Sequence, residues 1–174
     1  MERRIVTTTR ECAARLVPTG DPLTIPAGTF VTLTQDLGGA FTVVHQGNMA
    51  RVGPADADAL GLSVPPLDFP PSDVDGVDPE HVRAALESVY DPEIPVNISD
   101  LGLIYDVDID AARVSISMTL TNPGCGMGPV LVEEVKDRVR TVPGVDDVVV
   151  ELVFDPAWSR EMMTEEAKLD LGLF

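Results

Sequence analysis

The chain has 174 residues and a mass of 18.6 kDa, which leaves room for one medium-sized domain or two small ones. Its hydrophobic content of 44% is that of a globular protein, and no segment approaches the ~20 consecutive apolar residues that cross a bilayer. A net charge of −17 repels phosphate backbones and anionic lipids, so we expect neither nucleic-acid binding nor membrane attachment. Proteins and small molecules remain as partners.

The first residues and the cysteines indicate the compartment. Residues 1–12 carry charges but no apolar segment of a signal peptide, so we expect a cytoplasmic protein. The two cysteines, Cys12 and Cys125, lie far apart in sequence, which excludes a disulfide framework and a CxxC-type zinc or redox site. We expect both to be reduced thiols.

Acidic residues concentrate in the C-terminal part of the chain. Residues 1–64 contain five basic and six acidic side chains, whereas residues 65–174 contain seven and 23. The segment between these parts is rich in proline and aspartate, which is typical of an extended, solvated connector. We therefore predict a β-rich module over 1–64, a linker over 65–76 and a second module over 77–174.

The N-terminal module has the pattern of a small β fold. Short β-like runs lie at 4–9, 29–34 and 40–45, and turn residues separate them. Gly38 and Gly39 predict a hairpin between the last two runs, and another short run follows Gly47 and Asn48. These features favour a small β-barrel or β-meander, with one helical turn near 56–62.

The second module has the order α-β-β-α-β. Asp78 and Pro79 predict the start of a helix that continues to Tyr90, because they match an N-cap and the first helical position. Alternating strands are expected at 103–109, 114–120 and 145–154, an amphipathic helix at 130–139 and a short last helix at 164–170. The order predicts a two-layer α+β fold, with helices on one face of a small mixed sheet.

Cys125 is the residue most indicative of chemistry. It lies in the loop TNPGCGMG, which begins at Thr121 and comes directly before the second predicted helix. The free amides of a helix N-terminus stabilise a thiolate, and Gly124 and Gly126 leave the sulfur unscreened. The pattern therefore predicts a reactive thiol, with an inert buried cysteine as the alternative.

A nucleophilic hydrolase mechanism is disfavoured. Such a site needs a general base near the cysteine, and the chain offers only His45 and His81. We expect His81 to be a solvated surface residue beside Glu80, and His45 to lie at a strand end. Walker A, GxGxxG and HExxH motifs do not occur, so nucleotide-driven catalysis has no support either.

Two further clusters of residues could contribute to a site. Asp91, Glu93 and Asp100 lie in DPEIPVNISD, where carboxylates either bind a hard cation or, more commonly, hold a loop through backbone N–H groups. Asp155 and Trp158 follow the last strand. A lone tryptophan beside a proline is either a lid over the core or an anchor for a partner.

These motifs together resemble a known family. The segments DPEIPVNISDLGLIYDV, VSISMTLTNPGCGMG, VPGVDDVVVELVFDPAW and MMTEEAKLDLGLF are similar to SufT-type iron–sulfur assembly proteins. The wider family includes the PaaD proteins of phenylacetate degradation and a subunit of the eukaryotic cytosolic iron–sulfur targeting complex. The N-terminal module, with IPAG, LTQDLGG, FTVV and DADALGL, also resembles an extension that we expect to be specific to SufT.

The resemblance implies roles for particular residues. Asp91 and Glu93 match the acidic motif of the family, and Cys125 matches its reactive cysteine. The chain departs from the family where Gly126 replaces a proline after the cysteine, and where FDPAW, with Asp155 and Trp158, replaces WDPPW. The glycine is expected to loosen the cysteine loop.

The number of thiols limits the role in cluster assembly. Iron–sulfur clusters are held by four ligands, usually cysteines, and each chain brings one well-placed cysteine, so we expect no stably bound cluster. Either a homodimer shares a labile cluster through two Cys125 thiols and outside ligands, or the chain is an adaptor without a cluster. We expect a non-enzymatic maturation factor that contacts iron–sulfur assembly or carrier proteins and apo-clients. A thiol-dependent redox enzyme and an accessory subunit of a metallo-oxygenase are the alternatives.

Overall fold

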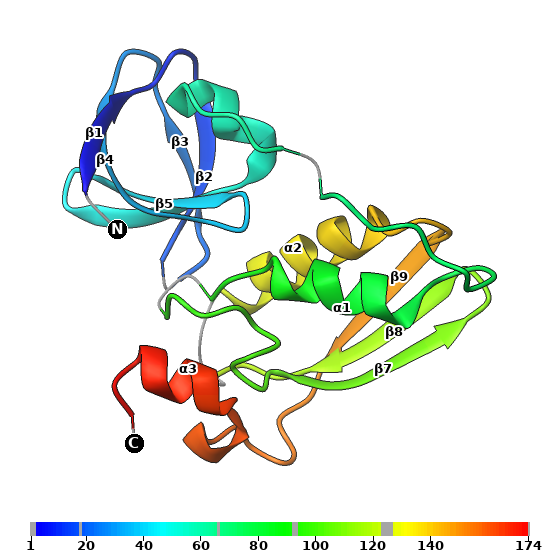
Figure 1. Cartoon of the computed structure of the whole chain (residues 1–174). Helices are drawn as coiled ribbons and strands as arrows, with labels where there is room; N and C mark the ends of the chain where they lie inside the picture. The colour runs from blue at the N-terminus through cyan, green and yellow to red at the C-terminus, as the bar shows by residue number, and fades with distance from the viewer. Residues whose placement is uncertain (1–2, 18, 66, 92–93, 123–126, 174) are drawn as a thin grey trace. The chain divides into compact units, whose positions relative to one another are not determined.

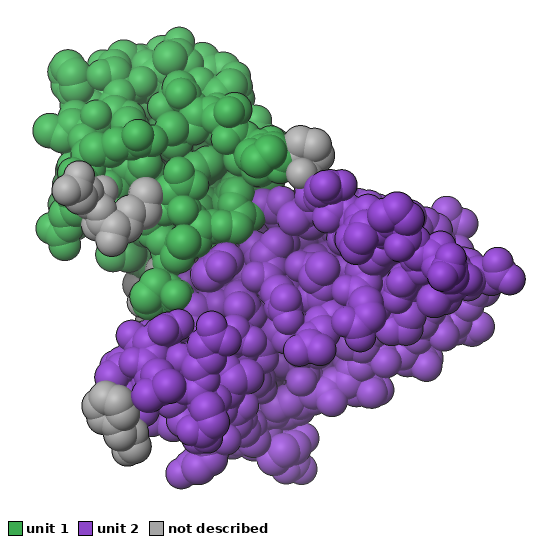
Figure 2. Space-filling model, in the orientation of Figure 1, with its two compact units in different colours: residues 1–66, 92–95, 126–130 green, residues 67–91, 96–125, 131–174 purple. Residues whose placement is uncertain are grey.

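The computed structural model describes residues 3–17, 19–65, 67–91, 94–122 and 127–173. The chain divides into two compact units (Figure 2). Unit 1 consists of residues 1–66, 92–95 and 126–130, and unit 2 consists of residues 67–91, 96–125 and 131–174.

Unit 1 contains a six-stranded antiparallel sheet (Figure 1). Its elements are β1 (Arg4–Thr7), β2 (Cys12–Leu16), β3 (Pro22–Ile25), β4 (Phe30–Leu37), β5 (Ala40–His45), β6 (Asn48–Val52) and the 3₁₀-helix η1 (Pro54–Leu60). Large apolar side chains from several strands, among them Ile25, Leu33 and Phe41, are fully buried and form the core together with Leu60 of η1.

Glycines allow the tight hairpins of this sheet. Gly38 and Gly39 both have positive φ, 65° and 83°, and they connect β4 to β5 in the two-residue turn that the sequence predicts. Gln46 and Gly47 connect β5 to β6 in the same manner, with φ values of 50° and 79°. The run β4-β5-β6 is therefore a meander.

Of the two predicted alternatives, β-barrel or β-meander, the barrel is wrong. The strand order is β1-β4-β5-β6-β2-β3, and within the described residues no pairing joins β1 to β3. Both end strands have only four residues, and β3 begins at Pro22, which has no N–H to donate and suits an edge position. The sheet is open at these two strands.

The remaining part of the chain has the predicted order α-β-β-α-β. Its elements are α1 (Pro79–Glu87), β7 (Ile104–Asp110), β8 (Arg113–Met118), α2 (Gly128–Arg140), β9 (Asp147–Leu152), the 3₁₀-helix η2 (Arg160–Met162) and α3 (Glu165–Asp170). β7 pairs with β8 antiparallel, and β8 pairs with β9 parallel, which makes the sheet mixed. Helices α1 and α2 cover one face of it (Figure 1). The two-layer α+β prediction is confirmed for this part.

The start of α1 is fixed by local chemistry. The Asp78 carboxylate accepts a hydrogen bond of 2.9 Å from the backbone N–H of Glu80, and Pro79 occupies the first turn, as the sequence predicts. Val82, Ala85 and Leu86 recur at helical spacing and are buried. Burying these three side chains stabilises the helix against the sheet by several kcal/mol in total, at ~25 cal/mol per Å² of apolar surface.

His81 is buried, so the prediction of a solvated surface histidine is wrong. Only 6% of the residue is exposed, and its Nε2 lies 2.8 Å from the carbonyl oxygen of Pro70. Because a carbonyl only accepts, Nε2 donates. The ring of Phe69 packs against it, with 5.2 Å between the ring centroids. The sequence pattern missed this because the preceding segment folds back over the first turn of α1.

We expect limited proteolysis to cut between residues 63 and 76 and to release a folded fragment that ends at the C-terminus. The described residues of this segment form no helix or strand, and residues 70–76 are exposed. Cuts before Phe69 should give the more stable fragment, because they keep its contact with His81. Mass spectrometry locates the cut, and circular dichroism tests folding. An unfolded fragment would mean that the two modules share one core.

Candidate functional site

The cysteine loop connects β8 to α2. Cys125, Gly124 and Gly126 lie outside the described residues, so the site is defined by the elements that flank it. β8 and β9 are parallel, and α2 is the crossover helix between them. The loop therefore leaves the carboxyl end of a parallel strand and enters a helix N-terminus, the place where α/β units usually bind ligands.

The described residues on both sides of the loop are buried or half-buried. On the strand side, Leu120 is buried and Thr121 is half-buried, and on the helix side Met127 is 3% exposed. The 13 residues of α2 give this end of the helix a full set of aligned peptide dipoles. Such a helix end favours a negative charge placed beside it. Cys125 lies outside the described residues, so the thiolate stays a prediction from the sequence.

Thr119 is a further candidate for the site, and the sequence pattern did not reveal it. It is 1% exposed, and its backbone N–H donates to the carbonyl oxygen of Leu103 over 2.8 Å. Its hydroxyl is buried and has no hydrogen-bond partner, and among the described residues it is the one side-chain group of which this is true. Such a group costs ~1–3 kcal/mol, and one in a native structure is often explained by function. Thr119 lies two positions before Thr121, at the foot of the cysteine loop.

Asp91 is 7% exposed, in a short turn that follows α1. Its backbone N–H donates to the carbonyl oxygen of Val96 over 3.2 Å, and Tyr90 forms a bridge with Asn97. Glu93 lies outside the described residues. These contacts join the described backbone before the acidic motif to the backbone after it.

Asp100 holds its loop, but its carboxylate does so through a side-chain amide and not through the backbone N–H groups that the sequence favoured. Its carboxylate accepts a 3.0 Å hydrogen bond from the side-chain amide of Asn97, and its backbone N–H donates to Oδ1 of Asn97 over 2.9 Å. Its carbonyl oxygen accepts from the N–H of Thr164, 2.9 Å away, at the start of α3. Asp100 therefore links the acidic loop to the C-terminal segment.

Trp158 contacts its own unit. The side chain is half-buried, and the indole N–H donates to the carbonyl oxygen of Leu101 over 2.7 Å. Nearby, the Tyr105 hydroxyl donates to the carbonyl oxygen of Pro156, also over 2.7 Å. Asp155 is exposed, and its peptide bond to Pro156 is cis. These bonds favour the lid interpretation of Trp158 over the partner-anchor interpretation.

The other cysteine is unsuited to exchange chemistry. Cys12 is fully buried in the core of unit 1. Burial, with a smaller contribution from the charge of Asp56, raises the pKa of its thiol to about 11.

In the described residues no three His, Cys, Asp or Glu side chains are placed to hold a metal ion together. No helix of the described chain is long and apolar enough to cross a bilayer.

Comparison with known proteins identifies the family. Residues 79–152 match the family described as iron–sulfur cluster assembly protein. A Porphyromonas gingivalis protein named as an Fe-S protein maturation auxiliary factor is 49% identical, with 53% of this chain and 90% of the relative covered. For the auxiliary factor YitW of Bacillus subtilis these values are 45%, 54% and 93%, and for SufT of Staphylococcus aureus they are 41%, 49% and 98%.

A crystal structure is similar in both fold and sequence. A domain from Bacillus anthracis, described as being of unknown function, has a TM-score of 0.52 and 42% identity, and the match covers 55% of this chain and 92% of that one. The chain therefore belongs to the iron–sulfur cluster assembly protein family. Its relatives include the SufT-type auxiliary factors, so the resemblance drawn from the sequence motifs is confirmed.

The N-terminal module stands outside this match. It precedes residue 79, where the family match begins. Moreover, the alignment with the S. aureus SufT spans 86 residues, which is 98% of that protein, so SufT has no room for a counterpart of both modules. The expectation that the β module is a SufT-specific extension is therefore not supported by this relative.

Proposed function

We propose that the protein is an accessory maturation factor that helps to assemble or deliver iron–sulfur clusters to apo-proteins. The observation that carries this proposal is the family match over residues 79–152, which includes the acidic motif and the cysteine loop. Three relatives are named as maturation auxiliary factors, and none of the three is named as an enzyme. The cluster is the cargo of this protein and not its resident cofactor.

In this proposal Cys125 is the transient ligand or exchange thiol. Soft thiolates bind iron in clusters, and the β8–α2 connection favours the thiolate form. Asp91 and Glu93 shape the site from the acidic loop, while Thr121, Gly124 and Gly126 leave the sulfur accessible. The unpartnered hydroxyl of Thr119 supplies a donor at the foot of the same loop.

A single chain cannot supply the ligands of a stable cluster. Four ligands are needed, and Cys12 is buried with a pKa of about 11, which leaves Cys125 as the available thiol. Assembly or carrier proteins, apo-clients or a second copy of this chain must provide the others. The labile thiol requires a reducing compartment, which agrees with a cytoplasmic location.

Complementation tests the proposal. In cells that lack the protein, we expect a [4Fe-4S] enzyme to lose most of its activity while an enzyme without a cluster keeps its own. The wild-type chain should restore the cluster enzyme, and Cys125→Ser should not, because serine fits the loop but binds iron poorly. Cys12→Ala is the matched control and should restore it.

The outcome separates the alternatives. If Cys125→Ser restored the cluster enzyme fully, the cysteine would be structural and the exchange mechanism wrong. Turnover of a small disulfide by the purified chain would favour the thiol-dependent redox enzyme. Loss of a single oxygenase activity, with other cluster enzymes intact, would favour the oxygenase accessory subunit.

A further inference from the structure

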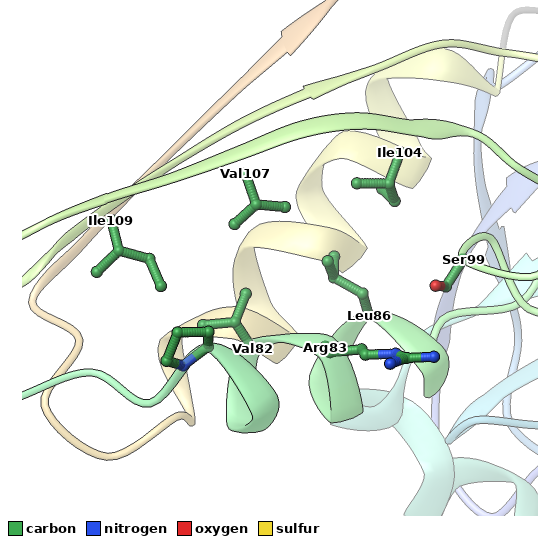
Figure 3. A pocket seen from close by; sticks show the side chains of 8 residues that line it. Val82, Arg83, Leu86, Ser99, Ile104, Val107 and Ile109 are labelled. Carbon is green, nitrogen blue, oxygen red and sulfur yellow. The ribbon is translucent and has the colours of Figure 1, made fainter. Parts of the chain in front are cut away.

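A groove lies between α1 and β7 in unit 2 (Figure 3). None of its lining residues belongs to the cysteine loop. Its volume is about 510 Å³. The apolar side chains that line it are Pro79, Val82 and Leu86 from α1, and Ile104, Val107 and Ile109 from β7. Arg83 and Ser99 are its polar lining residues, and the close-up shows them to the right of Val82 and Val107.

The groove exists because the helices cover the sheet unevenly. Val114 and Ile116 of the central strand β8 are fully buried under the helices. Val107 and Ile109 point to the same face from β7 but are only half-buried. A line of apolar side chains next to the edge of the sheet is therefore left partly open to solvent.

β7 is also an edge strand. The sheet order is β7-β8-β9, and in the described chain no strand pairs with the outer side of β7. After an irregularity between Ile104 and Asp106, the pairing with β8 is regular from Asp106 to Asp110. An edge strand of this kind directs alternate N–H and C=O groups outward and can accept an added strand.

The charges on β7 determine what can be added. Asp106, Asp108 and Asp110 alternate with the groove residues, so they lie on the opposite face of the sheet, and all three are exposed. In the described chain none of them forms an ion pair with a basic side chain. A second copy that paired through β7 would place these aspartates beside each other, and like charges on neighbouring strands are destabilising.

We propose that β7 and the α1 groove bind, by strand addition, an extended segment of a partner protein in which basic and apolar residues alternate. The apolar residues of this segment fill the groove, and its basic residues lie opposite the three aspartates. Main-chain hydrogen bonds to β7 hold the segment in register. The proposal uses only residues of α1 and β7, so it stands independently of the function proposed for Cys125.

The test uses the full chain labelled with ¹⁵N and a capped peptide of sequence Lys-Val-Lys-Ile-Lys-Val-Lys. We expect saturable binding, with the largest amide shifts in residues 104–110 and 79–86. A peptide with glycine in place of the apolar residues has the same charge and should not bind saturably. Equal binding of both peptides, or shifts centred on other elements, would show that general electrostatic attraction suffices and would overturn the proposal.

Two charge-reversal variants of the protein, one on β7 and a matched control on β9, test the role of the aspartates. Asp108→Lys should weaken binding of the peptide by about fivefold or more, because an attraction between neighbouring strands becomes a repulsion. Glu151→Lys makes the same change in charge on β9, the opposite edge of the sheet, and should alter the affinity less than twofold. Similar losses in both variants would contradict the proposal.

Sedimentation of the free chain distinguishes a second copy as the occupant. We expect the sedimentation coefficient of the wild type and of Asp108→Lys to agree across the concentration range used for the peptide. A dimer whose strength changes with Asp108→Lys would show that β7 pairs with itself and would overturn the choice of a basic partner.

Discussion

Gly102→Ala is expected to destabilise unit 2 by about 3 kcal/mol or more. Gly102 has a φ of +78°, a conformation that L-residues rarely adopt. A Cβ atom at this position would also overlap the backbone carbonyl of Met162, which cannot move aside as a flexible side chain does. The carbonyl lies in the segment that Asp100 and Trp158 hold in place, so the overlap strains two connected loops.

Trp158 provides the readout for this variant. It is the single tryptophan of the chain and lies in unit 2, so its fluorescence during denaturation reports this unit. Gly76→Ala is the matched control, because Gly76 has a φ of +79° but no atoms within 4 Å of the added Cβ. It should cost only about 1 kcal/mol. Equal losses in the two variants would show that Met162 does not constrain Gly102.

At pH 7.5 we expect iodoacetamide to label Cys125 at least about 100 times faster than Cys12 in the folded protein. The thiolate is the reactive form, and a thiol with a pKa of about 11 is about one part in 3,000 thiolate at this pH. Cys12 is also fully buried. Cys125 lies in a glycine-rich loop before a helix N-terminus, where the pKa of a thiol is lowered.

The labelling rates of the two cysteines should depend on pH in different ways. The pKa of Cys12 is raised, so its rate should increase about tenfold per pH unit from 7 to 9 without levelling off. The rate of Cys125 should level off within this range, because a reactive thiol at a helix N-terminus is expected to reach its thiolate form at lower pH than a buried thiol. Mass spectrometry of the labelled peptides measures both. Faster labelling of Cys12, or equal rates, would refute the thiolate argument.

Local sequence signals predicted most of the α-β-β-α-β part. Asp78 and Pro79 mark the start of α1 because capping depends on neighbouring residues only. The alternation in β7 and β8 reflects one buried and one exposed face, which a single sequence contains. Thr164 is likewise the N-cap of α3, where its hydroxyl accepts from the N–H of Ala167 over 3.2 Å.

What the sequence did not reveal depends on contacts between distant segments. The burial of His81 depends on Phe69 and Pro70, which fold back over α1. β2 and β3 went unpredicted because they are short and pair with each other across Gly20, outside the runs of clear alternation. The missing partner of Thr119 is a property of its surroundings, and no residue pattern encodes it. The half-open groove beside β7 likewise results from how far the helices extend over the sheet.

In the proposed mechanism Cys125 passes iron–sulfur clusters to other proteins, so the cluster content of a client protein reports its role. A tagged [4Fe-4S] client is isolated anaerobically from cells that carry the wild type, Cys125→Ser or Cys12→Ala, and its iron and acid-labile sulfide are measured per polypeptide. We expect Cys125→Ser to lower both to the level of cells without the protein, and Cys12→Ala to match the wild type. A client that is fully loaded in the Cys125→Ser cells would contradict the proposed mechanism.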